Sequence, residues 1–301
     1  MSTNITRVNA RQVIDSRGNP TIRQLPNGDA VLLDDVPVIL QKYRAIARGT
    51  KTVRDHLGFL LESNAIRNQI LVPKYYNPEI ERDLSSLKKT YDLVQVGKLV
   101  EDGDLSIETG VEIGKMAYGT GRIPFIRTSD ISNWEIKEDY KHGVSQDIYE
   151  QYRGKVDVEP NDILMVRDGT YLIGTTAIVT KSDIPMLFQS HIYRIRVLRT
   201  SRVNAWLLIS ILNSPIVKRQ IRAKQFTQDI IDTIGKRLYE VVLPIPKDSR
   251  LKKRVSDETE KVIHTRIRLR NRIKEIAYEV QGLPGTVHEE EDPIEEIGEP
   301  E

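Results

Sequence analysis

Short apolar runs alternate with turn residues through the middle of this 301-residue chain. The strand-like runs are YDLVQV, RIPFIRTSD, DILMVRD, TTAIVT and HIYRIRVL, and turns rich in Gly and Asp separate them. A later run, YEVVLPIP at 239–246, predicts a final strand that two prolines end. Strands of this kind around an embedded helix predict one α+β domain, a mixed sheet over 91–246.

The embedded helix is predicted over 204–224, NAWLLISILNSPIVKRQIRAK. Its apolar residues recur at helical spacing, so most of them should belong to the core. They are Trp206, Ile209, Leu212, Ile216 and Ile221.

A long helix is predicted over 249–280, with Ser249 as a cap and Gly282 as a stop. Its apolar residues follow a heptad pattern of roughly four and a half repeats, which favours pairing with a partner helix. The residues expected on that partner-facing side are Val255, Val262, Leu269, Ile273 and Ile276. Two polar interruptions, Thr259 and Arg266, would fix the register. The alternative is an amphipathic helix that packs on its own domain.

The region before the domain has a less regular pattern. Residues 1–60 combine a β-like stretch at 30–40 with a basic segment at 42–56, and the sequence does not indicate their role. Residues 61–90 are expected to be a linker and helical lead-in. Within them, Pro73 and Pro78 beside Tyr75 and Tyr76 predict extended chain rather than a core element.

The opening residues 10–21, ARQVIDSRGNPT, resemble the start of enolases. The resemblance runs from Ile5 to about Ile22 and then stops, and no eightfold alternation of strands and helices follows. We therefore interpret 15–20 as a tight turn between two short strands and do not expect enolase activity.

Composition places the chain among soluble globular proteins, with 39% hydrophobic and 29% charged residues. No apolar run approaches the ~20 residues that a membrane span requires. The chain has no cysteine, which excludes disulfides and cysteine zinc sites and fits a reducing compartment. We expect a cytoplasmic protein that does not bind membranes.

The net charge of +2 conceals an asymmetry. The last sixteen residues hold eight acidic and no basic side chains, so 45 basic and 35 acidic side chains remain over 1–285, a net charge of +10. A basic body attracts phosphate or another polyanion. The tail, 283–301, is expected to be disordered. An ordinary solvated surface is the alternative explanation of the charge.

Motifs for nucleotide chemistry are incomplete. Met116 follows Gly114-Lys115 where a P-loop needs Ser or Thr. Asn77-Pro78 lacks the second proline that adenine methyltransferases carry, and the histidines have no paired zinc-ligand spacing. We predict no catalytic residue, no metal and no cofactor in this chain.

Two alternative functions stay open at this point. Glu135 and Lys137, with Asp130 upstream, have the residue types of a metal-dependent nuclease, and Glu112 with Lys115 forms a poorer set. An assembly protein that acts only through the C-terminal helix is the other alternative.

Three loops instead favour DNA binding. Segment 114–134 contains a glycine-rich loop, 162–180 has a turn between two strands, and 220–232 carries Gln and Lys near a helix end. Arg and Gln recognise base edges, whereas Lys, Thr and backbone amides hold phosphates. Each loop alone fits an ordinary turn, but three on a basic chain without catalytic residues indicate DNA recognition.

Four segments in order resemble the target-recognition domains of DNA specificity (S) subunits from type I restriction–modification systems. They are GRIPFIRTSDI at 121–131, DILMVRDGTYLIGTTAIV at 162–179, AKQFTQDIIDTIGKRLYEVVLPIP at 223–246, and the long helix, which resembles a spacer helix. The resemblance covers about 91–280. Members usually carry two recognition domains and two spacer helices, whereas this chain has room for one of each.

The resemblance implies a non-catalytic specificity subunit that binds double-stranded DNA. The expected DNA contacts are Arg122, Arg127, Arg167, Tyr171, Gln189, Lys224, Gln225 and Gln228. The helix would dock a DNA adenine methyltransferase subunit, which brings the S-adenosylmethionine chemistry, and in some systems a restriction/translocase subunit. Pairing through 249–280, either as a homodimer or with a second half-length specificity subunit, would supply the second recognition domain.

Overall fold

The computed structural model of the chain describes residues 22–24, 30–32, 37, 40, 41, 44, 45, 48, 59, 61, 63–137, 140–169, 171–228 and 231–280. The enolase-like opening, most of the basic segment 42–56 and the acidic tail lie outside the described residues. Contacts divide the chain into two compact units, Met1–Leu71 and Val72–Glu301. In the first unit, β1 (Ile22–Gln24) pairs antiparallel with β2 (Ala30–Leu32), and η1 covers Ser63–Ala65.

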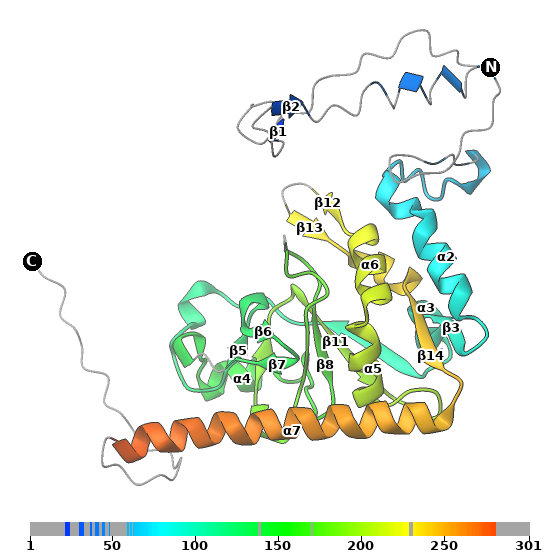
Figure 1. Cartoon of the computed structure of the whole chain (residues 1–301). Helices are drawn as coiled ribbons and strands as arrows, with labels where there is room; N and C mark the ends of the chain where they lie inside the picture. The colour runs from blue at the N-terminus through cyan, green and yellow to red at the C-terminus, as the bar shows by residue number, and fades with distance from the viewer. Residues whose placement is uncertain are drawn as a thin grey trace, which may run out of the picture. The chain divides into compact units, whose positions relative to one another are not determined.

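A four-stranded antiparallel sheet forms the centre of the second unit (Figure 1). Its order is β4-β11-β8-β9, with bounds Leu105–Thr109, Ile192–Val197, Ile163–Val166 and Thr176–Ile178. Strand β8 has the uninterrupted apolar sequence ILMV because both of its faces are buried. Ile163 and Met165 belong to one hydrophobic cluster, and Leu164 and Val166 belong to the other.

Two-stranded pairs surround this sheet. They are β3 (Tyr91–Gln95) with β14 (Val242–Pro246), β5 (Phe125–Ile126) with β10 (Leu187–Phe188), β6 (Ile131–Ser132) with β7 (Glu135–Ile136), and β12 (Phe226–Gln228) with β13 (Ile231–Thr233). Only β5–β10 is parallel. The two prolines of the predicted final strand lie within β14, which has a single partner strand and so needs fewer N–H donors.

The helices lie between and beside these pairs. The α-helices are α2 (Pro78–Leu87), α3 (Val96–Glu101), α4 (Gln146–Tyr152), α5 (Ala205–Leu212), α6 (Pro215–Lys224) and α7 (Ser249–Val280). The 3-10 turns are η2 (Pro73–Tyr76), η3 (Lys115–Ala117), η4 (Thr128–Asp130), η5 (Tyr140–His142), η6 (Lys181–Asp183) and η7 (Gly235–Glu240). The predicted α+β fold with a long C-terminal helix is confirmed.

The single helix predicted over 204–224 is wrong, because the chain forms two helices there. Helix α5 ends before Asn213-Ser214, and α6 begins with Pro215 at its first position, where the missing N–H costs nothing. The predicted core residues are buried on both helices, except that Ile216 is only partly buried.

The extended linker predicted around Pro73 and Pro78 is also wrong. The chain forms η2 and then α2. The Asn77 side chain caps the first turn of α2, because it accepts a hydrogen bond from the Glu79 amide at 3.0 Å. Tyr75 is buried, packs edge-on against Phe226 and donates a hydrogen bond to Glu240. This segment is therefore part of the second compact unit.

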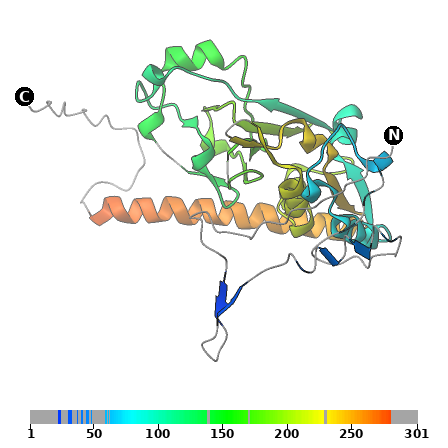
Figure 2. The ribbon, with the colours of Figure 1, turned by 90° about the horizontal axis from the view of Figure 1, so that it is seen from above.

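Helix α7 runs along the second unit past α5 at its N-terminal half and past β6–β7 further on (Figures 1 and 2). Its docked side includes three buried residues, Ser256, Thr259 and Ile263. Arg266 then donates to the Asn133 carbonyl at 2.7 Å, and Arg270 donates to the Ile136 carbonyl at 3.1 Å. The helix is thus fixed to its own domain along one side.

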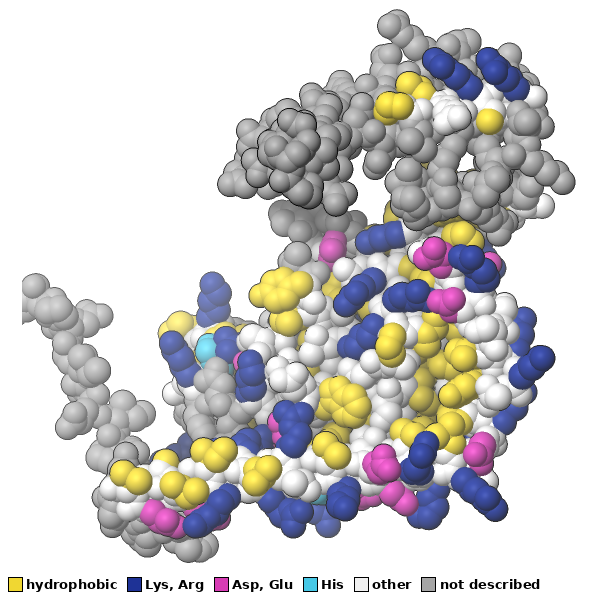
Figure 3. All heavy atoms as spheres, in the orientation of Figure 1, with side chains coloured by type: hydrophobic (Ala, Val, Ile, Leu, Met, Phe, Trp, Pro, Cys, Tyr) yellow, Lys and Arg dark blue, Asp and Glu magenta, His cyan; other side chains and the backbone are white. Residues whose placement is uncertain are grey.

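A second side of α7 carries exposed apolar residues, visible in Figure 3 as a row along the C-terminal half of the helix. We call this the apolar stripe, and its members are Val262, Leu269, Ile273, Ile276 and Val280. At 100° per residue the stripe lies about a quarter turn from the docked side. Val255, predicted to face a partner, packs partly against the domain's own core instead.

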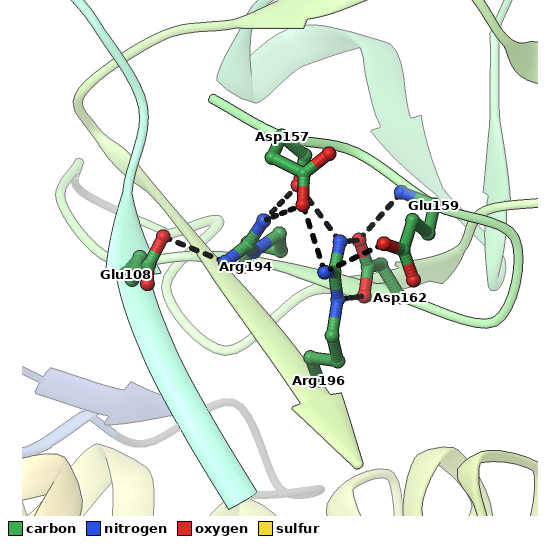
Figure 4. Close-up of polar contacts among 6 residues, drawn as sticks. All are labelled: Glu108, Asp157, Glu159, Asp162, Arg194 and Arg196. Carbon is green, nitrogen blue, oxygen red and sulfur yellow. Dashed lines mark hydrogen bonds and ion pairs between the residues drawn. The ribbon is translucent and has the colours of Figure 1, made fainter. Parts of the chain in front are cut away.

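Two arginines on β11 connect the sheet to the loop before β8 (Figure 4). Arg194 is 4% exposed and contacts Glu108 of β4 at 2.6 Å. Arg196 contacts the buried Asp162 at 2.7 Å and Asp157 at 2.9 Å. The hydrogen bond to Asp162 raises the pKa of Arg196 despite its partial burial. These pairs hold loop 157–162 against the sheet and so fix the start of β8.

Within the described ranges, no helix is long and apolar enough to cross a membrane.

Candidate nucleic-acid interface

Segments that are far apart in sequence meet at one end of the central sheet, where β8 ends and β11 begins. We call this the loop end, and define it by Glu112, Arg167–Tyr171, Gln189–His191 and the β12–β13 hairpin. The Arg167 amide donates to the His191 carbonyl at 2.9 Å. The Gly169 amide donates to the Asp232 carbonyl at 2.9 Å, so the turn after β8 is bonded to the hairpin.

The parallel pair β5–β10 brings a third segment to the loop end. Arg127 follows β5 and Gln189 follows β10, and the Gln189 amide donates to the Ile126 carbonyl at 2.9 Å. Val111 and Ser190 are joined by the Ser190 amide, which donates to the Val111 carbonyl at 3.1 Å. Arg127, Arg167 and Gln189, predicted separately as DNA contacts, are therefore on connected segments.

A charged cluster lies at the centre of the loop end. One oxygen of Asp168, Oδ2, is 2.6 Å from Nη2 and 2.8 Å from Nε of Arg167. The same oxygen is 2.9 Å from Nδ1 of His191. His191 Nε2 lies 3.9 Å from Glu112 Oε1, and Ser190 donates to the same glutamate. Asp168 is buried, whereas the Arg167 side chain is 28% exposed.

Arg167 and Asp168 stabilise each other in their charged forms. Burial alone would raise the pKa of Asp168, but hydrogen bonds from Arg167 and His191 outweigh it and lower that pKa. Burial likewise works against the charge of Arg167, yet its bond to Asp168 raises the pKa of the guanidinium. Asp168 was not predicted from the sequence, although it directly follows Arg167.

Part of the Arg127 guanidinium bonds to residues near it in the fold. Its Nε lies 3.3 Å from Asp130 Oδ2, and its Nη1 lies 2.9 Å from His142 Nε2. The Asp130 carboxylate also accepts the Arg127 amide at 2.9 Å, which closes the η4 turn. Arg122 is exposed on the segment before β5, beside the bridge between Ile123 and Val144, and so lies at the other end of that strand.

Tyr171 is 87% exposed on the turn after β8, an unusual position for a large aromatic ring. Gln189 is partly exposed on its loop. Both stay predicted DNA contacts.

Lys224 and Gln225 lie at the base of the β12–β13 hairpin. The Lys224 ammonium is 3.1 Å from Glu240 Oε2 and 4.3 Å from the centre of the Tyr75 ring, so it also holds η2 to the domain. Gln225 ends α6 and is partly exposed. Gln228 is the last residue of β12, but its side chain lies outside the described residues.

Two further basic residues flank the hairpin. Arg222, in the last turn of α6 before β12, and Lys236, which follows β13, are exposed near the base of the hairpin. Arg237 lies 4.2 Å from the Phe226 ring centre and donates to the Lys224 carbonyl at 2.6 Å, which stiffens the hairpin base. The sequence signal for these residues was the basic composition around 218–237.

The residues of the alternative nuclease site have structural partners. Glu135 is 2.7 Å from Arg266 Nη2, so this carboxylate helps to dock α7. The Lys137 amide donates to the Asp130 carbonyl at 2.8 Å. Among the residues that the structure describes, no three His, Asp or Glu side chains are placed to hold a metal ion.

No protein-family model and no curated protein sequence matches the chain. Solved structures do. One is the crystal structure of a type I restriction–modification S subunit from M. genitalium, with 14% identity and a TM-score of 0.42, covering 62% of this chain and 44% of that one. Another is the HsdS subunit from Thermoanaerobacter tengcongensis, with 12% identity and a TM-score of 0.37, covering 78% and 61%.

A third match comes from a structure on complex assembly and conformational transition of the type I R-M system, with 12% identity and a TM-score of 0.38, covering 82% of this chain and 49% of that one. The chain thus spans 44% to 61% of the length of these matches. Type I S subunits are among the structures that the chain resembles, as the sequence segments indicate. Because the TM-scores are below 0.5, its function has to be argued from its own residues.

Proposed function

We propose that this chain is a non-catalytic DNA specificity subunit that binds double-stranded DNA through the loop end. The observation that supports this most is the bonded junction of the Arg167–Tyr171 turn, the Gln189–His191 loop and the β12–β13 hairpin. Segments that are well separated in sequence are held together there by backbone hydrogen bonds. Such an arrangement suits an extended ligand.

The hairpin provides the shape that duplex DNA accepts. The major groove admits a two-stranded β-ribbon, and β12–β13 is such a ribbon of three residue pairs. Its base is stiffened by Arg237 on Phe226, so the ribbon enters a groove at little entropic cost. Arg222 and Lys236 precede and follow it in the chain, and these exposed cations would contact phosphates near its base.

The proposed partners bind through α7. The apolar stripe is a row of exposed aliphatic side chains on a helix that is already docked by another side. Such a row is typical of a helix–helix contact. We assign it to α7 of a second specificity chain, identical or of another half-length kind. The paired helices would position a DNA adenine methyltransferase subunit and, in systems that have one, a restriction/translocase subunit.

A binding assay tests the central part of this proposal. The purified full chain is titrated with a random-sequence duplex pool at several salt concentrations, alone and with a type I DNA adenine methyltransferase subunit. We expect affinity to fall steeply with salt and repeated selection to enrich one sequence. Salt-independent or absent binding in both states would contradict the proposal and would favour an assembly protein without DNA contact.

A further inference from the structure

Asp168 controls how Arg167 is presented at the loop end. Oδ2 of this buried carboxylate accepts hydrogen bonds from Nε of Arg167 and Nδ1 of His191, and Nη2 of Arg167 forms an ion pair with the same oxygen. The guanidinium is also 5.6 Å from the Tyr193 ring centre. The Arg167 amide and carbonyl are bonded to His191 and Ile234, so backbone and side chain are both fixed.

The bonds to Asp168 use one edge of the guanidinium. Nε and one hydrogen of Nη2 point to the carboxylate, which leaves the edge formed by Nη1 and the second Nη2 hydrogen. No described residue accepts a hydrogen bond from Nη1. With its side chain 28% exposed, Arg167 presents two parallel N–H donors at a defined angle.

Such a fork suits a base better than a phosphate. A phosphate can also accept an arginine fork, but that contact gains most of its strength from net positive charge, and the charge of Arg167 is balanced by Asp168 next to it. A base edge instead requires direction. Guanine is the base that offers two adjacent acceptors, N7 and O6, to a pair of parallel donors in the major groove.

We infer that Arg167 recognises one guanine of the DNA site through its Nη1–Nη2 edge, and that Asp168 is the positioning residue that makes this contact selective. This inference rests on the proposed DNA binding and adds the identity of one base. His191 shares the carboxylate oxygen and keeps Asp168 in place. Tyr171, four residues further on, is 87% exposed and is a second candidate for DNA contact.

The test starts from the duplex that the full chain selects from a random pool. Each guanine is replaced in turn by 7-deazaguanine, which lacks the N7 acceptor. At one position we expect wild-type affinity to fall about 5- to 150-fold. Arg167→Lys should retain binding to non-specific duplex but lose the sensitivity at that position, since lysine has no fork.

The Asp168→Asn variant tests whether Asp168 orients Arg167, provided that the variant is still folded. We expect it to lower the preference for guanine at the same position by about tenfold, while its affinity for non-specific duplex stays equal or rises because a negative charge is removed. Asp183→Asn, at the η6 cap, removes the same charge away from Arg167 and should change neither quantity. Far-ultraviolet circular dichroism and thermal melting show whether each variant is folded.

Two results would overturn the inference while leaving the proposed function intact. One is a selected site in which no guanine is sensitive to the loss of N7. The other is a folded Arg167→Lys variant that keeps the wild-type sensitivity. If the wild-type chain binds no duplex at all, the proposed function fails and the inference fails with it.

Discussion

Ser210 of α5 and Thr259 of α7 share a hydrogen bond of 2.7 Å between their hydroxyl oxygens at the contact of the two helices. Thr259 is 8% exposed, and its hydroxyl also bonds to the Val255 carbonyl one turn earlier at 2.7 Å. The heptad pattern predicts that Thr259 faces a partner helix. The structure shows that it faces the chain's own domain instead.

Thr259→Val should lower the free energy of unfolding by about 1 kcal/mol, because the Ser210 hydroxyl loses a partner at a buried contact. Urea denaturation followed by circular dichroism measures the change. Thr265→Val is the matched control, since that hydroxyl bonds only within α7 at an exposed position. Equal effects of the two substitutions would show that the contact between α5 and α7 contributes nothing.

Leu269→Asp should abolish helix pairing without unfolding the domain, because Leu269 is 59% exposed in the isolated chain. A leucine buried in a helix–helix contact contributes about 2 kcal/mol, and a charge there costs more. Sedimentation velocity of the chain, alone and mixed with the methyltransferase, measures the assembly. Lys261→Asp on the outer side of α7 is the control, and loss of pairing in that variant too would argue against the apolar stripe.

Arg222→Ala should weaken DNA binding by the same factor on every sequence, as expected for a phosphate contact on the flank of the hairpin. The slope of log affinity against log salt should decrease by about one. Lys181→Ala, which removes an exposed charge from η6, should leave the slope unchanged. A sequence-dependent loss at Arg222 would instead assign it to a base.

Because Lys218 is buried, we expect the free energy of unfolding to rise with pH. Burial lowers its pKa from 10.5 to about 8 in the folded chain. The unfolded chain therefore binds more protons between about pH 8 and 10.5, and the free energy of unfolding increases over that window. We expect a gain on the order of 2 kcal/mol, and Lys218→Met should remove it. Parallel slopes for the two proteins between pH 8 and 10 would refute this.

The Glu135→Ala variant tests whether Glu135 is a nuclease residue or a structural residue that docks α7. Since Glu135 pairs with Arg266, we expect this variant to lose about 1 kcal/mol of stability. Duplex incubated with magnesium should stay intact with the wild-type chain and with the variant. Cleavage by the wild type that disappears in Glu135→Ala would establish the nuclease.

Local signals predicted much of the fold. Heptad spacing indicated the extent of α7, and the apolar run ILMV indicated the buried strand β8. The predicted cap Ser249 is wrong, because the Asp248 side chain accepts the Arg250 amide at 2.9 Å and caps the helix. The break between α5 and α6 was missed although Ser214-Pro215 is a recognised start signal for a helix. There the continuous apolar periodicity of 204–224 hid the boundary.

Other features depend on distant partners and were not predictable. Tyr75 is buried because Phe226 and Glu240, over 150 residues later, contact it. In the same way, Arg167 and Gln189 were predicted as separate contacts, but Asp168 and His191 form one cluster only after β8 and β11 pair. Sequence therefore indicated the residue types at the candidate site, whereas strand pairing determines which of them act together.

Because Ile263, Arg266 and Arg270 lock the rotation of α7, the fold itself determines the direction in which the apolar stripe faces. One residue inserted after Arg270 would turn the later part of the stripe by about 100° and move it by about 1.5 Å, without disturbing a single bond at Arg167. Under the proposed function, the distance between two half-sites would therefore change independently of the bases that each domain recognises.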